Sequence, residues 1–447
     1  MFFIAFPLGD TYNALDPASP REEFMPYKPL FILALCALST ALAGLFGCED
    51  TVKYLNEAPS ELRITAEKCY VATGATIRLV GRATDADEDS LTFRWSATSG
   101  SFPAGAVNDT VYWKAPSTFG TATITMTVTD EIDTRSLQQA ITVCELLPAQ
   151  VIMSRTIANA GHTYITRGDA PMRIAGNVTL TIEPGVTIVM DRSLGGIESY
   201  GRIVARGTPS QKISLRGNTC SSETALWKGI YLIEATGEGI FRNCEITAGM
   251  DGVMARDGAK LDIKDCQIYN HYDFGVTVLY GATATIRSCS IWDNGDGVYV
   301  DDASAEIRRC SIRYSDGDGI LCAASQDEIH ASIESCVVAN NYKNGFVIAD
   351  RAAPAIHYCS IFANSEAGAG TYAVRLSANI SPTPIHAENN YWGLGNDTEE
   401  EIAAIIYDAV DNPGAIFAYV SFIPWLVEAP AARHPAASGA SGRSWAR

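Results

Sequence analysis

From about Leu62 to Val143, apolar and polar residues alternate in short segments that turn residues separate. The segments read "ATIRLVGRAT", "LTFRW", "TVYWKAP" and "TATITMTVTD". Alternation with a period of two residues is typical of strands that bury one face. Strands at this spacing over about 85 residues predict a sandwich of two β-sheets.

A different pattern runs from about Val151 to Leu426, where cysteines recur between aliphatic residues, as in "IKDCQIYN", "IRSCSIWDN" and "IHYCSIFAN". The six cysteines of this series are 22, 23, 21, 26 and 23 residues apart: Cys244, Cys266, Cys289, Cys310, Cys336 and Cys359. Glycines run in phase with them, each followed by a short apolar strand: Gly252, Gly275, Gly297, Gly319 and Gly345. Two strand signals per period, without a helical pattern, predict one coil of a parallel β-solenoid per period.

Equivalent residues of successive coils stack about 4.8 Å apart in such a solenoid. The cysteines are therefore predicted to form an interior column of small apolar fillers, with a metal or redox role as the alternative. Thiols that share a column point the same way, which disfavours disulfides between adjacent coils. Asparagines and Asp-Gly or Asn-Gly pairs are predicted to mark turns: Asn270, Asn294, Asn341, Asn364 and the pairs 251–252, 296–297, 318–319 and 344–345.

Residues 177–217 and "WKGIYL" (227–232) resemble the entry coils of bacterial right-handed parallel β-helix repeat proteins of the pectate-lyase-like superfamily. "ENNYWGLG" (388–395) and "VSFIPWL" (420–426) resemble their closing segment. The run from "DADEDSLTFRW" to "AITV" is similar to bacterial Ig-like domains of the polycystic-kidney-disease or cadherin-like type, which bury an indole at the place of Trp95. These resemblances imply an all-β fold class, an Ig-like β-sandwich followed by a right-handed parallel β-helix.

The N-terminal region resembles that of a bacterial lipoprotein. Lys28 precedes an apolar run from Leu30 to Leu45, which is typical of a secretory signal, and "STALAG" interrupts the run, which disfavours a transmembrane helix. "LFGC" (45–48) resembles the lipobox, which implies that Cys48 is acylated and becomes the mature N-terminus. We therefore expect a lipid-anchored protein of the cell envelope, on a periplasmic or surface face of the outer membrane.

The predicted organisation follows from these segments. Its parts are an over-extended start (1–24), a lipoprotein signal peptide (25–47), a tether (48–61), the Ig-like sandwich (62–147), the β-helix with its C-terminal cap (148–427) and a disordered tail (428–447).

The net charge of the chain limits the classes of partner that it can bind. The chain has 33 basic and 51 acidic residues, a net charge of −18, which disfavours nucleic acid as a partner.

An exported chain meets an oxidising compartment, in which disulfides form. Because the first and last strands of a sandwich can be neighbours, Cys69 and Cys144 are predicted to form a disulfide.

Catalysis is weighed because several pectate-lyase-like enzymes cut acidic polysaccharides. Asp301 and Asp302 in "YVDDAS", with Asp257 and Asp350 at comparable places in other coils, are the catalytic candidates. The Asn-Thr-Asp, Ser-His-Gly and Arg-Ile-Lys elements of polygalacturonase-type hydrolases are missing from the sequence. An enzyme is therefore the less favoured interpretation.

Two columns of the solenoid are candidates for holding a ligand. Three residues after each cysteine come Thr247, Tyr269, Trp292, Arg313, Ala339 and Phe362. Two residues before each cysteine come Arg242, Lys264, Arg287, Arg308, Glu334 and His357. If both columns face outward, Tyr269, Trp292 and Phe362 offer rings for sugars, and Lys264, Arg287 and Arg308 offer cations. The alternative is that the rings cover a loop and that residues such as Asp265 and Glu245 neutralise the cations.

In the Ig-like segment, Asp85, Asp87 and Asp89 alternate like the start of a calcium loop, but the glycine and distal glutamate of an EF-hand are missing. A calcium ion and a solvated turn both stay open there, and no other cofactor is predicted.

We expect a monomer that touches the membrane only through its lipid and whose β-helix binds glycan or another surface polymer without catalysis. The alternatives are a polysaccharide lyase or glycoside hydrolase and a structural envelope protein.

Overall fold

The computed structural model describes residues 56–191, 195–220, 226–326, 331–364, 368, 370–378 and 381–430. The predicted signal peptide, Cys48 and the tail beyond residue 430 lie outside the described residues. Among the residues described, no helix is long and apolar enough to cross a membrane. Nearly all regular structure is β, as the sequence predicts.

The N-terminal part contains one three-stranded sheet and the first strands of a long sheet that continues into the rest of the chain. One has the order β1-β3-β5, and in the other β4, β6 and β7 are antiparallel neighbours while β2 pairs with β7 in parallel. The strands are β1 (Ser60–Ala66), β2 (Tyr70–Ala72), β3 (Thr76–Thr84), β4 (Thr92–Ala97), β5 (Thr110–Lys114), β6 (Gly120–Thr129) and β7 (Thr134–Leu146).

These two sheets enclose one apolar core, because the strands alternate as the sequence predicts. Trp95 is buried there, and its Nε1 donates a hydrogen bond to the carbonyl oxygen of Asn108 at 2.8 Å. Trp113 is fully buried and donates to Ser99 in the same way. The indoles thus fill the core while their single donors stay satisfied.

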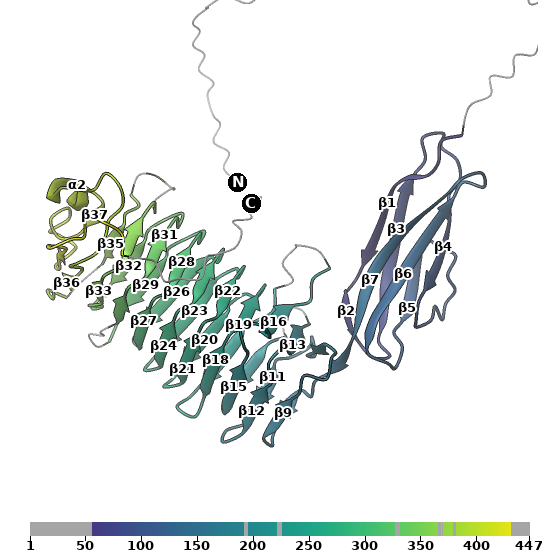
Figure 1. Cartoon of the computed structure of the whole chain (residues 1–447), viewed down its shortest axis with the longest axis horizontal. Helices are drawn as coiled ribbons and strands as arrows, with labels where there is room; N and C mark the ends of the chain where they lie inside the picture. The colour runs from purple at the N-terminus through teal and green to yellow at the C-terminus, as the bar shows by residue number, and fades with distance from the viewer. Residues whose placement is uncertain are drawn as a thin grey trace, which may run out of the picture. The chain divides into compact units, whose positions relative to one another are not determined.

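The rest of the chain is a solenoid with three parallel sheets, whose strands lie side by side along it in Figure 1. The arginine sheet is named for the basic column at its strand ends, the cysteine sheet for the residues that precede its strands, and the glycine sheet for the glycines of the repeat.

The arginine sheet contains β9 (Arg155–Ile157), β12 (Thr179–Ile182), β15 (Arg202–Arg206), β18 (Glu238–Arg242), β21 (Lys260–Lys264), β24 (Thr283–Arg287), β27 (Ser304–Arg308), β30 (Ser332–Glu334), β33 (Ala355–His357), β36 (Ile385–His386) and β38 (Val420–Ser421). The cysteine sheet contains β10 (Tyr164–Ile165), β13 (Thr187–Met190), β16 (Ile213–Gly217), β19 (Cys244–Thr247), β22 (Gln267–Tyr269), β25 (Ser290–Trp292), β28 (Ser311–Arg313), β31 (Val337–Ala339) and β34 (Ser360–Phe362). The glycine sheet contains β8 (Gln150–Val151), β11 (Met172–Ile174), β14 (Ile197–Ser199), β17 (Ile230–Ile233), β20 (Val253–Arg256), β23 (Phe274–Leu279), β26 (Asp296–Asp301), β29 (Ile320–Ala323), β32 (Phe346–Ala349), β35 (Val374–Ser377) and β37 (Ile406–Tyr407).

The predicted interior column of cysteines is confirmed. All six cysteines of the repeat are buried, and none of them forms a disulfide. They lie where the arginine sheet turns into the cysteine sheet, packed beside isoleucines such as Ile263 and Ile268. The period of the cysteines is therefore the period of the coil.

The predicted turn residues are partly wrong. Positive φ occurs one residue earlier, at Asp293, Asn340 and Ala363, so Asn294 and Asn341 are not the left-handed residues. Instead Asn294 and Asn341 are buried and bond along the stack, as Asn341 Nδ2 does to the Oδ1 of Asn364 at 2.9 Å. Asparagine suits this buried place because its amide accepts a backbone N–H and donates to a carbonyl group of the preceding coil, as Asn341 does with Ser315 and Ile312.

The glycines of the Asp-Gly and Asn-Gly pairs are also not turn residues with positive φ. They lie at the start of strands of the glycine sheet, where a side chain has no room. A Cβ on Gly297 would lie 2.4 Å from the carbonyl oxygen of Gly319 and 2.5 Å from Ile312 Cγ2. Close packing of coils, not turn conformation, explains these glycines.

Strand β7 belongs to both parts of the chain, because its last residues pair with β10 of the solenoid. The predicted disulfide Cys69–Cys144 is wrong as a consequence. Cys144 lies opposite Ala72, three residues after Cys69, and is buried as a free thiol against Ile165. Cys69 bonds instead to Cys220, with their Cα atoms 4.9 Å apart.

The C-terminal end carries the helix α2 (Glu399–Ala404), which begins with a capping box between Thr398 and Glu401. Its buried Ile402 packs on the solenoid core. The short strands β37 and β38 continue the glycine and arginine sheets past this point, as expected of a closing segment.

Candidate functional site

The basic residues of the repeat form one outward column on the arginine sheet. Strand register places Arg242 beside Lys264, Lys264 beside Arg287, and Arg287 beside Arg308. Glu334 and His357 continue the column on the next two coils. The predicted stacking of these residues is therefore confirmed.

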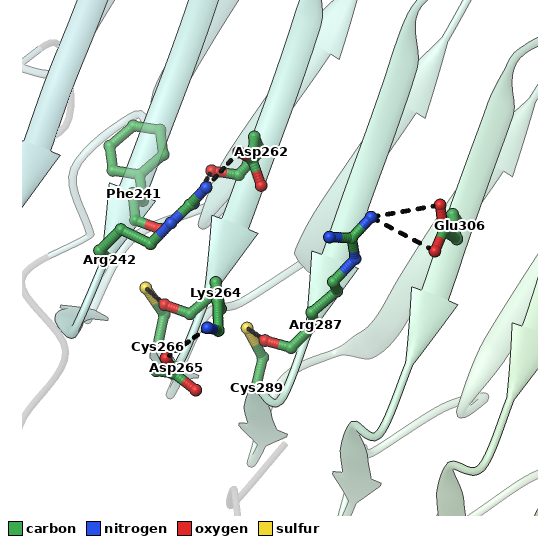
Figure 2. A network of polar contacts seen from close by, with 9 residues as sticks. All are labelled: Phe241, Arg242, Asp262, Lys264, Asp265, Cys266, Arg287, Cys289 and Glu306. Carbon is green, nitrogen blue, oxygen red and sulfur yellow. Dashed lines mark hydrogen bonds and ion pairs between the residues drawn. The ribbon is translucent and has the colours of Figure 1, made fainter.

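The cysteine column fixes the main chain from which the cations project. The thiol of Cys266 donates to the carbonyl oxygen of Lys264 at 3.3 Å, and that of Cys289 donates to Arg287 at 3.2 Å. Figure 2 shows the sulfur atoms beside these carbonyl groups, with the basic side chains running away from them. An interior packing residue thus also holds the turn that carries each exterior cation.

The cations differ in how firmly acidic neighbours hold them. Arg242 donates to the carboxylate of Asp262 and also to its carbonyl oxygen at 2.9 Å, while its side chain is only 25% exposed (Figure 2). Arg308 lies 2.8 Å from the carboxylate of Glu306. The guanidinium group of Arg242 is therefore engaged, whereas Arg308 makes this contact through Nε and its side chain stays 47% exposed.

Lys264 and Arg287 are held more loosely. The nearest atoms of Lys264 and Asp265 are 3.7 Å apart, and Arg287 approaches both oxygens of Glu306 only to 3.4 Å (Figure 2). Charge-assisted hydrogen bonds are usually about 2.7–2.9 Å long. Since both side chains are 50% exposed, they have donors left for an external anion.

A cleft of about 450 Å³ lies over this column. Its lining consists of Lys264, Arg287, Ser288, Glu306, Arg308, Arg309, Glu334 and Ser335. Four cations and two carboxylates give the lining a net charge of +2, whereas the whole chain carries −18. The cleft is thus a local positive site on an acidic protein.

The aromatic column does not form the predicted exposed strip. Trp292 is only 6% exposed, and its ring stacks on that of Tyr269 with centroids 4.3 Å apart. Tyr269 is half-buried and donates to Glu245, and Arg313 lies over the ring of the half-buried Phe362. These rings pack on one another and none of them lines the cleft, so the prediction that both columns border one groove is wrong.

The two acidic candidates Asp301 and Asp302 differ in their surroundings, which shift their pKa values in opposite directions. Desolvation raises the pKa of Asp301, and repulsion from Asp302 and Asp350 adds to it, against a hydrogen bond from the hydroxyl of Tyr299 at 3.0 Å. For Asp302 partial desolvation is outweighed by hydrogen bonds from Ser325 and the following amide, which lower its pKa. Asp302 is thus committed to holding a loop at a corner of the coil.

Asp257, Asp302 and Asp350 share that corner, since all three have a left-handed backbone with φ of 57°, 46° and 56°. The predicted equivalence of these places between coils is confirmed. Their common feature is a turn conformation that aspartate tolerates well, which accounts for the residue type without catalysis.

The predicted calcium residues do lie together. Asp85, Asp87 and Asp89 have carboxylate oxygens within 4.8 Å of one another. Partial desolvation and then repulsion from Asp85 and Asp87 raise the pKa of Asp89. However, Asp85 Oδ1 already accepts the backbone N–H groups of Asp87 and Asp89, as in a turn. Calcium binding there stays a prediction.

Several cleft residues escaped the sequence interpretation. Glu306 lies two residues before Arg308, on the same face of β27, and Arg309, Ser288 and Ser335 lie at the corner that follows the column. The repeat that locates the column also locates these positions. The repeat does not indicate, however, that the side chains at these positions line one cleft.

Residues 204–381 match the family model described as "Right handed beta helix region". This match agrees with the three parallel sheets that those residues form. This part of the chain forms a parallel β-helix, and over the matched residues it is similar to right-handed ones. No curated protein matches the sequence.

Among solved structures, the chain is similar to the crystal structure of the periplasmic alginate epimerase AlgG, at 10% identity and a TM-score of 0.32. The likeness covers 64% of this chain and 85% of the epimerase chain. At these values it carries no argument about what the β-helix described here binds or catalyses.

Proposed function

We propose that this protein is a lipid-anchored, extracytoplasmic binding protein whose β-helix holds an acidic glycan in the basic cleft without cleaving it. The observation that carries the proposal is the cleft of net charge +2, lined by Lys264, Arg287, Arg308 and Arg309, on a chain of net charge −18. Adjacent cations repel one another, so a column of this kind favours an anion that bridges them.

The lining also bears on the chemical class of the ligand. All eight lining residues are charged or carry a hydroxyl, as Ser288 and Ser335 do. Apolar ligands bind in clefts lined mainly by apolar side chains. A ligand rich in hydroxyl and carboxylate groups fits this surface better than a lipid or an apolar peptide.

Binding and cleavage are separated by one experiment. The protein is run in native gels that contain polygalacturonate or alginate, and the same polymers are incubated with it in solution and checked for new reducing or unsaturated ends. We expect retardation in the gel and unchanged chain length. Loss of chain length would contradict a pure binding role, and unchanged mobility in every acidic polymer would refute the proposal.

A matched pair of variants assigns binding to the cleft. Arg287→Gln and Arg308→Gln together remove two cleft cations, and Lys260→Gln with Arg202→Gln removes two cations of the same sheet that do not line the cleft. Each pair changes the net charge equally. Only the first pair is expected to abolish retardation.

Anchoring is proposed on the sequence around Cys48, which lies outside the described residues. The disulfide Cys69–Cys220 supports an oxidising compartment. In a bacterial host with lipoprotein processing, the wild-type protein should enter the detergent phase on phase separation, and Cys48→Ala should stay in the aqueous phase. Equal partitioning of both would contradict the anchor.

The segment of residues 62–147 is proposed to be an Ig-like spacer between the anchor and the β-helix. Its support is the common core that the strands β1–β7 enclose and the buried Trp95.

A lyase or hydrolase is the second candidate, because Asp301 has a raised pKa and one carboxylate oxygen that is buried without a hydrogen-bond partner among the described residues. A raised pKa suits a carboxyl group that donates a proton. If the polymer incubations yield products, Asp301→Asn should stop them and Asp257→Asn should not.

A further inference from the structure

The exposed part of the basic column spans a defined number of coils. Lys264, Arg287 and Arg308 lie on three consecutive coils in direct register, with side chains 50%, 50% and 47% exposed. Neighbouring coils are about 4.8 Å apart along the solenoid axis. The exposed cations are therefore spaced at one per coil.

Each end of this run is closed. On the preceding coil Arg242 is largely buried and donates to the carbonyl oxygen of Phe241 as well as to Asp262. On the following coil the column position is Glu334, which repels anions and itself lies 3.3 Å from Arg308. The run of exposed cations is three coils long.

The cations are also suited to carboxylates. A guanidinium group presents a planar fork of donors that matches a carboxylate in a bidentate arrangement. One nitrogen of Arg287, Nη2, approaches both oxygens of Glu306 at 3.4 Å each, so the fork of Arg287 is not closed on this carboxylate. Ser288 and Ser335, at the adjoining corner of the coils, add hydroxyl groups for the rest of the ligand.

We propose that the cleft binds a linear polyuronate that runs parallel to the solenoid axis, with one sugar carboxylate per coil over Lys264, Arg287 and Arg308. A pyranose ring with its glycosidic oxygen is comparable in length to one coil, so successive carboxylates can meet successive cations. The site therefore requires three consecutive acidic sugars. This inference rests on the proposed function and specifies the ligand length and direction.

The first test is calorimetric titration of the wild-type protein with di-, tri- and tetragalacturonate at low salt. Since an exposed ion pair contributes up to about 1 kcal/mol, we expect affinity to rise about fivefold from the dimer to the trimer and little from the trimer to the tetramer. An even rise with every added sugar, or none, would overturn the one-per-coil register. Absence of binding to all oligomers and to the polymer would overturn the proposed function as well.

The second test uses two lysines of one strand. Lys264 and Lys260 lie at opposite ends of β21 on the same outward face, and only Lys264 lines the cleft. Lys264→Gln shortens the run to two cations, so the trimer should lose its advantage over the dimer. Lys260→Gln should keep that advantage. If both variants weaken all oligomers equally, the interaction is a diffuse charge effect and the proposed register is wrong.

Discussion

The cysteine column and the basic column have the same period and stand two residues apart, but one faces into the β-helix and the other faces out. Six coils carry the same buried residue on the inside. Over the same six coils the outside changes from four cations to Glu334 and then His357. The constant column reports packing, and under the proposed function the column that varies determines where along the β-helix the ligand binds.

The two columns are nevertheless coupled. Each thiol donates to the carbonyl group of the exterior residue two positions earlier, as Cys289 does to Arg287 and Cys310 does to Arg308. The interior therefore sets the spacing of the cations, and we expect their charge to contribute little to the stability of the fold. Substitutions in the cysteine column and in the basic column should therefore affect stability and binding separately.

The largest expected difference in stability is between a carboxylate placed in the cysteine column and one placed in the basic column. Cys289→Asp buries a carboxylate among apolar residues and should lower the free energy of unfolding by more than about 4 kcal/mol. Arg287→Asp puts the carboxylate in the exposed column and should change it by less than about 1 kcal/mol. Urea denaturation measures both. Equal losses would show that the columns do not differ in the way described.

The next effect concerns the aromatic column. Because Trp292 is almost fully buried, Trp292→Ala should cost about 3 kcal/mol of unfolding free energy, whereas Tyr272→Ala, at a side chain that is 58% exposed, should cost less than about 0.5 kcal/mol. Glycan retention of the folded Trp292 variant should be unchanged. Lost retention at unchanged stability would restore the exposed strip that the sequence suggested.

A smaller effect should appear on acidification. Burial lowers the pKa of His271 from 6.5 to about 4, since the ring takes an interior place equivalent to Asn294. The unfolded chain therefore binds the proton at higher pH than the folded chain does. The stability that the neutral ring gives the fold is complete above pH 6.5 and is lost as the pH falls toward 4. The loss should be on the order of 3 kcal/mol.

His271→Asn is the matched control for this pH dependence. The ring accepts the backbone N–H of Gly249 through Nδ1 and donates to Ile246 through Nε2, and an asparagine amide can make the same two bonds. The variant should be stable at neutral pH and should lose this part of the acid sensitivity. An unchanged pH profile would assign the sensitivity to other groups.

The sequence predicted the features of the fold that follow from the repeated cysteine. A cysteine in every coil implies an inward position, and the alternation of strands then places Arg287 and Arg308 outside. It did not predict that Trp292 is covered, because burial of an outward ring depends on how Tyr269 on the neighbouring coil lies across it. It also missed the pairing of Cys69, because that depends on the parallel register of β2 and β7.

The central claim is that ligand recognition lies on the arginine sheet and not at the acidic residues of the glycine sheet. A crystal structure of the protein with trigalacturonate tests it most directly. The account predicts the three sugars along the solenoid axis, with carboxylates within hydrogen-bond distance of Lys264, Arg287 and Arg308. A sugar bound instead against Tyr299 and Asp301, with the cleft unaltered, would contradict it.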